Sequence, residues 1–176
     1  MSTKVLQTPR EWYECLEAGC AAVRRPFALS QFQRPGVPRL SVFHIPSFVD
    51  ATGWTIYYLP REKSYKLQTV IWRQQADGRR MEDVMHGRVL RVSPEPTLEE
   101  RYSDFSRDSA EQMIATLGRI TIPLLARQNI GCDGESFGVR VEHNFEVEWW
   151  CDGPKEWAEL TRWARDSIDV LLKKNA

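Results

Sequence analysis

The sequence has little of what marks a membrane protein or a nucleic-acid-binding protein. No stretch approaches the roughly 20 apolar residues that span a bilayer, and the segment Met1 to Pro9 has no apolar run like that of a signal peptide. Lys and Arg total 24, Asp and Glu also total 24, and no block of like charges stands out. We therefore expect a cytoplasmic protein that binds neither a membrane nor nucleic acid.

Cysteine and histidine are also scarce. The cysteines are Cys15, Cys20, Cys132 and Cys151. The histidines are His44, His86 and His143. Neither set has the spacing of a metal site, and four cysteines are too few for a disulfide scaffold. We expect free, mostly buried thiols and no metal or other cofactor.

The chain of 176 residues has the length of one domain with a sizeable core. Its patterning predicts a single α+β domain over residues 1–176. The expected architecture is a mainly antiparallel sheet of about five to seven strands with three helices. The expected helices are Pro9–Val23, Arg107–Leu117 and Pro154–Lys173. Oligomeric state is left open by the sequence.

The first expected helix starts with a capping pattern, because Thr8 can cap it and Pro9 suits its first turn. Gly19 lies within its apolar stripe, where the missing side chain lets another element approach closely. Strand-like runs follow at Leu40–Ile45, Trp54–Leu59 and Tyr65–Arg73. The short polar link between the second and third runs predicts an antiparallel hairpin.

The middle of the chain has weaker patterns of secondary structure. Residues 74–101 indicate only a turn at Asp77-Gly78 and a short strand at Arg88–Val92. The second helix begins near Ser106, and Gly118 suits its end. Residues Ile120–Leu125 are typical of a short buried strand or an extended segment.

The strongest pattern is a β-hairpin followed by a long amphipathic helix, within Gly134 to Lys174. Aligning its two apolar sets pairs Val141 with Phe145, Val139 with Val147, and Phe137 with Trp149. The loop is then Glu142-His143-Asn144, with Asn144 in its left-handed position, and Arg140 lies opposite Glu146. Asp152 or Gly153 caps the last helix.

Candidate catalytic groups lack the context that their chemistry requires. Ser136 lies in a G-x-S-x-G pattern, but a strand rather than a helix follows it. Glu146 and Glu148 lie roughly 7 Å apart on one strand face, which alternation explains equally well. Cys132 and Cys151 have no base placed to activate them. We therefore assign no catalytic residue.

Tryptophan is the unusual feature of the composition, with seven residues. Adjacent strand residues face opposite ways, so Trp149 and Trp150 cannot enter the same core. We predict Trp150 as an exposed anchor, supported by Trp163 on the flank of the last helix, although an N-terminal segment covering Trp150 is the alternative. The expected binding residues are Trp150, Trp163, Arg140, Glu146, Glu148 and His143.

A resemblance covers about the last quarter of the chain. The residues that carry it are Gly131-Cys132-Asp133-Gly134, a strand, Trp149-Trp150, Pro154, Trp157 and Leu160. This pattern resembles small bacterial α+β proteins, some of them similar to toxin-neutralising immunity proteins. The resemblance implies a compact cytoplasmic protein that acts by binding and has no catalytic residues.

The function expected from these observations is non-enzymatic binding of one protein partner, with an immunity-like role as one form of it. Two alternatives stay open. A small hydrolase would use Ser136 or Glu146. A carbohydrate-binding module would use exposed tryptophans as a stacking surface.

Overall fold

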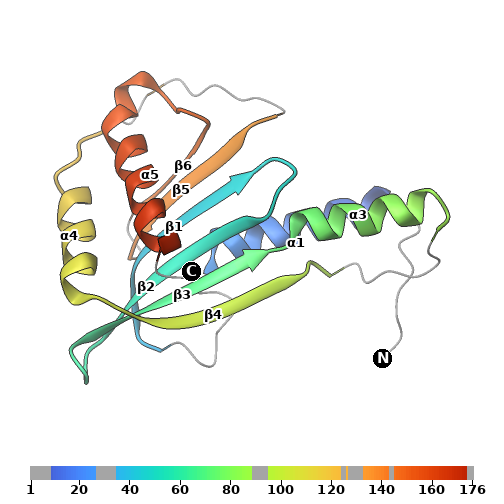
Figure 1. Cartoon of the computed structure of the whole chain (residues 1–176). Coiled ribbons are helices and arrows are strands. Elements are labelled where there is room, and N and C mark those ends of the chain that lie inside the picture. Colours follow the sequence, from blue (N-terminus) through green and yellow to red (C-terminus); the bar gives the residue numbers. More distant parts are fainter. Residues whose placement is uncertain are drawn as a thin grey trace.

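The fold is α+β and is built on one six-stranded antiparallel sheet (Figure 1). The computed structural model describes residues 9–26, 35–88, 95–123, 126, 133–142 and 145–173. The strands are β1 (Val37–Pro46), β2 (Ala51–Leu59), β3 (Ser64–Trp72), β4 (Leu98–Phe105), β5 (Glu135–Val141) and β6 (Phe145–Trp150). Their order across the sheet is β4-β3-β2-β1-β5-β6, which places β4 and β6 at the two edges.

Helices lie on both sides of this sheet (Figure 1). They are α1 (Pro9–Arg24), α3 (Gln74–Met85), α4 (Arg107–Leu117) and α5 (Ala158–Lys173), with a single 3-10 turn, η1 (Lys155–Trp157), before α5. Helices α4 and α5 cover one face, here called the α4/α5 face. Helix α1 packs on the opposite face, here called the α1 face, and α3 lies beside it.

The larger core lies under α4 and α5. It combines helix residues such as Met113, Leu160 and Ile168 with strand residues such as Trp54 and Leu67. The residues from α5 recur every three or four positions, so one stripe of the helix is buried against the sheet. Burial of this apolar area is the main stabilising contribution on this face.

The core under α1 is smaller and more closely packed. Val23, Phe43, Ala51 and Trp72 form it, and all four are buried. Gly19 lies directly over the Trp72 ring, because a Cβ built there would come within 2.3 Å of the ring atom Cε2. The predicted close approach at Gly19 is confirmed, and it explains a glycine in the middle of a helix.

The structure confirms much of the expected pattern. The second and third strand-like runs pair as the β2–β3 hairpin, and α4 has the bounds expected for the second helix. Ser106 caps α4 with its side chain, and Gly118 occupies the C-cap. The three pairs predicted for the β5–β6 hairpin all occur, and Arg140 lies opposite Glu146.

Two elements in the middle of the chain were missed, namely α3 and β4. The expected turn at Asp77-Gly78 is wrong, because both residues lie inside α3. Asp77 is buried in the first turn, where it accepts hydrogen bonds from the Trp72 indole at 2.9 Å and from the Thr97 backbone N–H at 2.9 Å. These contacts with residues before and after α3 in the sequence favour the helix in a segment whose local signals indicate a turn.

The start of the C-terminal helix also differs from the expectation. Neither Asp152 nor Gly153 caps a helix, because η1 intervenes and its N-cap is Pro154. Gly153 has φ +67°, a turn conformation that glycine adopts without strain, and the Asp152 side chain instead binds Arg165 at 2.8 Å.

Several further predictions concern the edges of the described segments. Residues 120–123 form no strand, so the strand interpretation of that segment is wrong over those four residues. Glu142, at φ +50°, takes a left-handed position in the β5–β6 loop. The predicted roles of Thr8 and Asn144, and residues 89–92 of the expected short strand, lie outside the described residues.

Candidate binding site at the edge of the sheet

Strand β6 forms one edge of the sheet among the described strands, and the direction of its hydrogen bonds follows from one contact at its end. The Cys151 N–H donates to the Glu135 carbonyl at 2.7 Å, so these residues form a hydrogen-bonded pair. In an antiparallel ladder such pairs recur at every second residue. Phe145, Val147 and Trp149 therefore bond to β5. The backbone groups of Glu146 and Glu148 and the N–H of Trp150 point to the outer edge, whereas the Trp150 carbonyl accepts a hydrogen bond from Gly153.

On the α1 face of the hairpin, the two predicted glutamates form ion pairs with arginines. Glu146 pairs with Arg140 of β5, and Glu148 accepts a hydrogen bond from Arg24 of α1 at 2.6 Å. Sequence reasoning foresaw the first of these pairs, but Arg24 lies 124 residues away from its partner.

The predicted aromatic anchor is only partly accessible. Trp150 lies on the same face as Arg140 and Glu146, as alternation predicts, and is half-buried. Trp163 is 7% exposed and belongs to the core under α4 and α5. The expectation that it adds to an exposed anchor is corrected, because the apolar arc of α5 is wide enough to bury it. His143 lies outside the described residues.

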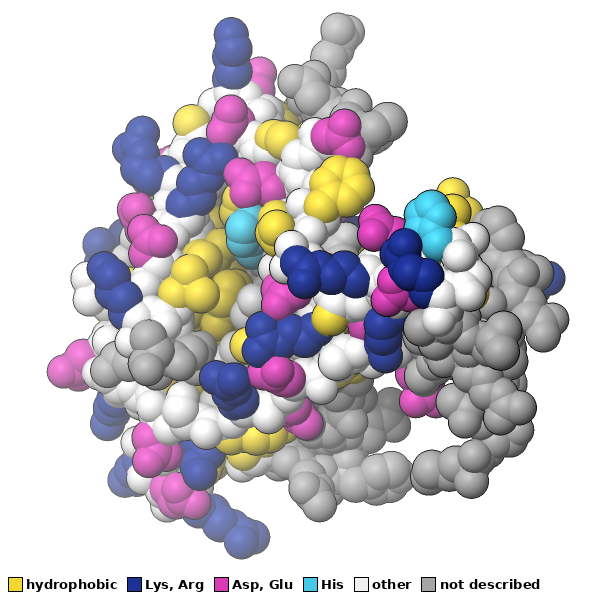
Figure 2. Space-filling view, turned by 45° about the vertical axis from the view of Figure 1, so that its right-hand side comes forward, with side chains coloured by type: hydrophobic (Ala, Val, Ile, Leu, Met, Phe, Trp, Pro, Cys, Tyr) yellow, Lys and Arg dark blue, Asp and Glu magenta, His cyan; other side chains and the backbone are white. Residues whose placement is uncertain are grey.

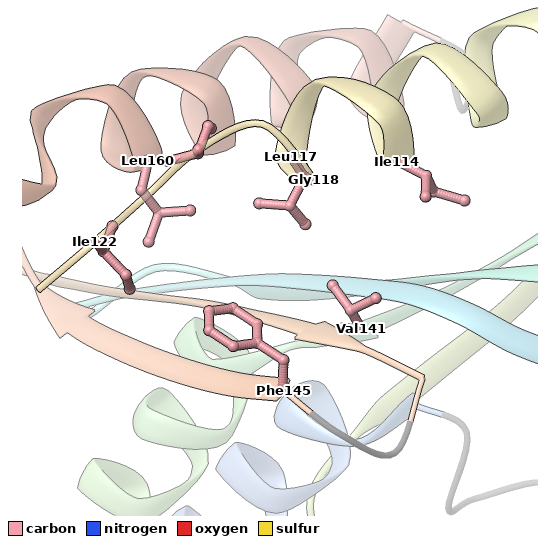
Figure 3. A pocket seen from close by; sticks show the side chains of 8 residues that line it. Ile114, Leu117, Gly118, Ile122, Val141, Phe145 and Leu160 are labelled. Carbon is pink, nitrogen blue, oxygen red and sulfur yellow. The ribbon is translucent and has the colours of Figure 1, made fainter. Parts of the chain in front are cut away.

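A pocket that sequence reasoning missed opens on the α4/α5 face of the same hairpin (Figure 3). Its volume is about 290 Å³. Its described lining consists of Ile114, Leu117, Gly118, Ile120, Ile122, Val141, Phe145 and Leu160. In Figure 3, Val141 and Phe145 rise from the strands while Leu117 and Leu160 point down from the two helices.

The chemistry of this pocket is that of apolar contact. None of the side chains in its described lining carries a charge or a hydrogen-bonding group. Phe145, the first residue of β6, is 37% exposed and forms part of its wall. Such a site suits an aliphatic or aromatic side chain of a partner. The only sequence signal was the apolar set of the hairpin, because the other walls come from α4, the segment after it and α5.

The sequence also did not predict a second cluster of polar side chains, which connects β1, β5 and α5. His44 of β1 hydrogen-bonds Glu135 at 2.8 Å, and Arg165 of α5 lies 3.6 Å from the same carboxylate and 2.8 Å from Asp152. The His44 ring stacks on Phe137, which also stacks on Trp149 and lies under the Arg165 guanidinium. Figure 2 shows acidic and basic side chains intermixed over its face of the molecule, with apolar side chains between them. We interpret this group as a structural link between α5 and the sheet.

The remaining sequence candidates occupy structural positions. Ser136 lies within β5, where it pairs with Ile45 on one side and Trp150 on the other, and not on a strand-to-helix turn. Cys15, Cys20 and Cys151 are free thiols, and burial raises the pKa of Cys15 to about 11. Cys132 lies outside the described residues. Among the residues that the structure describes, no group of three or more His, Cys, Asp or Glu side chains is placed to hold a metal ion.

No described helix combines the length and the hydropathy needed to cross a lipid bilayer. No family model matches this chain, and comparisons with curated proteins and with solved structures give no match. The resemblance of its last quarter to toxin-immunity proteins therefore stays a prediction.

Proposed function

We propose that this chain is a non-enzymatic protein-binding protein whose contact surface is the loop end of the β5–β6 hairpin. One observation carries the proposal: an apolar pocket of about 290 Å³ lies beside an edge strand and has a partly exposed phenylalanine, Phe145, in its wall. Exposed apolar sites beside polar residues are characteristic of protein interaction sites.

The surrounding residues supply the polar rim that such interfaces have. Glu146 and Arg140 lie on the other face of the same hairpin, and Glu142 pairs with Arg39 at 2.9 Å near the loop. An apolar centre with charged residues around it is the usual composition of an interface. The burial of Trp163 removes one of the two rings expected for a sugar-stacking surface.

The immunity-like form of this proposal rests on the resemblance of the C-terminal residues. It assigns the partner as a toxin that the chain neutralises by covering a surface. Genes for such pairs lie next to each other, so the products of the adjacent reading frames are the partners to test.

The test is binding of each adjacent gene product to the wild-type chain and to two matched variants. Phe145→Ala removes the aromatic wall of the pocket, and Phe48→Ala removes a more exposed phenylalanine from the turn after β1. We expect one product to bind with a stoichiometry of one to one, and Phe145→Ala to weaken it about tenfold or more. Phe48→Ala should change the dissociation constant less than twofold.

Two results would overturn the proposal. One is that no adjacent product binds. The other is that Phe145→Ala and Phe48→Ala bind alike, since the contact surface would then lie elsewhere. Calorimetry gives the affinity and the stoichiometry together, and circular dichroism of each variant shows that the fold is retained.

A further inference from the structure

The mode of binding can be inferred more closely from the edge strand, on the basis of the proposed function. We propose that the partner contributes an extended segment that adds to β6 as a seventh strand. Its side chains alternate between apolar residues on the α4/α5 face and Lys or Arg on the α1 face. The apolar side chain opposite the start of β6 enters the pocket.

The backbone of β6 is suited to such an addition. The contact from Cys151 to Glu135 fixes Phe145, Val147 and Trp149 as the residues that bond to β5. The backbone N–H and C=O groups of Glu146 and the N–H of Trp150 therefore point away from the sheet, whereas the Trp150 carbonyl accepts a hydrogen bond from the Gly153 N–H at 2.9 Å. Within the part of the chain that the structure describes, β6 ends the strand order. Edge strands with this geometry bind extended peptides through main-chain hydrogen bonds.

The side chains of β6 specify the pattern of the partner. Phe145 and Val147 lie on the face of the pocket, whereas Glu146 and Glu148 lie on the opposite face. Residues directly opposed in neighbouring strands share a face, so an added strand matches this alternation position by position. Apolar residues are then required beside Phe145, and positively charged residues beside the glutamates.

The carboxylates remain within reach of a partner although both form ion pairs. The Glu146 side chain is 47% exposed, whereas its partner Arg140 is 16% exposed, so the negative member of the pair faces the solvent. The Glu148 side chain is 41% exposed. A basic side chain on an added strand would contact these carboxylates from the open side, which favours a basic partner segment.

The same charges disfavour a second copy of the chain as the occupant. When two β6 strands pair antiparallel with their apolar faces aligned, the opposed residue numbers have an even sum. In the registers centred on this strand, Glu146 of one copy then lies opposite Glu148 of the other. In the neighbouring registers, Glu146 or Glu148 lies opposite the same residue of the second copy. Like charges directly opposed destabilise strand pairing. A heterologous basic segment avoids this repulsion.

Strand β4, the other edge, lacks this combination. The backbone N–H of Arg73, just after β3, donates to the Thr97 carbonyl, so the backbone of Asp104 also points outward by the same alternation. However, charged residues occupy both faces of β4, with Glu99 and Arg101 on one face and Asp104 on the other. Charged side chains on both faces protect an edge against pairing. Asp104 therefore provides the matched control for Glu146.

The experiment uses a fluorescein-labelled synthetic peptide of nine residues that alternates valine with lysine. Fluorescence anisotropy measures its affinity for the wild type, for Glu146→Pro and for Asp104→Pro. Each proline removes one outward N–H and leaves the ladder to the neighbouring strand intact. We expect Glu146→Pro to weaken binding about tenfold, through a lost hydrogen bond and a clash with the added strand. Asp104→Pro should alter the affinity less than twofold.

Two further peptides test the inference with the wild-type protein alone, and so do not depend on whether a variant folds. One carries N-methyl groups on alternate amides, and the other has glutamate in place of lysine. Both should bind at least about tenfold more weakly than the parent peptide. Absence of binding by the parent peptide, or equal binding of all three, overturns the inference.

The variants also separate this inference from the proposed function. If Phe145→Ala weakens the natural partner while Glu146→Pro leaves that affinity unchanged, the pocket is used but strand addition is wrong. If neither substitution has an effect, the proposed contact surface is wrong as well. If Asp104→Pro weakens binding as much as Glu146→Pro, edge-specific addition at β6 is wrong.

Discussion

The two faces of the sheet are buried in different ways. The α4/α5 face is covered by two helices over a continuous apolar core with large side chains such as Trp54 and Trp149. The α1 face has a small apolar core, beside which polar side chains are fully buried and hydrogen-bonded to one another. Tyr57 donates to Gln68 at 2.7 Å, and Ser41 bonds Thr55 at 3.0 Å.

This difference shows how one sheet can be stabilised by two means. On the α4/α5 face the stability comes from apolar area removed from water. On the α1 face a helix approaches so closely that glycine is required, and the buried polar groups must be satisfied to avoid a desolvation cost. Gln68 meets that requirement by donating to the Pro26 carbonyl at 3.0 Å as well as accepting from Tyr57.

The sharpest test compares two adjacent residues of β3 that face opposite ways, Leu67 and Gln68, both 0% exposed. Leu67→Ala leaves a cavity in the larger core and should lower the free energy of unfolding by about 2–5 kcal/mol. Gln68→Ala removes hydrogen-bond partners from Tyr57 and from the Pro26 carbonyl, and should cost about 1–3 kcal/mol. Urea denaturation measures both.

A double substitution separates the polar mechanism from loss of volume. Tyr57→Phe with Gln68→Leu removes both partners of one hydrogen bond and keeps the apolar volume, so its cost should be smaller than the sum of the two single substitutions. Additive costs, or a larger loss for Gln68→Ala than for Leu67→Ala, would contradict the proposed difference between the faces.

A second test compares two glycines in the helices on the α1 side. Gly19→Ala places a methyl group against the Trp72 ring, which is buried and cannot move freely, and should destabilise the fold by about 1–3 kcal/mol. Gly78→Ala, in α3, meets no atom within 4 Å and should stabilise by up to about 1 kcal/mol. Thermal and urea unfolding give the sign of each change, and equal signs would show that close packing does not determine the choice of glycine.

The smallest expected effect lies outside both cores. Arg73, just after β3, donates to Glu99 at 2.8 Å and to Asp50 at 2.8 Å, and the first of these hydrogen bonds lowers the pKa of the Glu99 carboxyl. A folded-state pKa below the unfolded value of about 4.3 contributes stability above that pH and loses it as the pH falls through the folded value. Glu99→Gln should therefore flatten the acid side of the stability curve, which urea midpoints between about pH 3 and pH 6 would show.

The control for this third test is Glu17→Gln, which removes the same charge from an exposed position on α1. Its acid profile should follow that of the wild type. If both variants lose the same acid dependence, net charge rather than the contact with Arg73 accounts for it.

How far the sequence predicted the structure differed from one region to another. The register of the β5–β6 hairpin could be deduced in full, because alternation and a short loop leave one solution that aligns Phe137, Val147 and Trp149 on one face. Helix α3 could not be deduced, because Asp77 and Gly78 locally indicate a turn and the contacts with Trp72 and Thr97 that favour the helix lie outside it.

The candidate site shows the same limit. Alternation alone placed Arg140 opposite Glu146 and put Trp150 on the face opposite Trp149. It gave no sign of the ion pair between Arg24 and Glu148, nor of the pocket whose walls come from α4, α5 and the hairpin. The burial of Trp163 likewise depended on which neighbours α5 has.

The sequence alone determined which strand residues share a face and where the helices α1, α4 and α5 lie, because these depend on periodicity within a few turns or one hairpin. Only the tertiary structure decided that β4 and β6 are the edges, and that an apolar pocket opens beside β6. Strand order and pocket walls depend on contacts between residues far apart in the chain, and the local spacing of residues does not encode them.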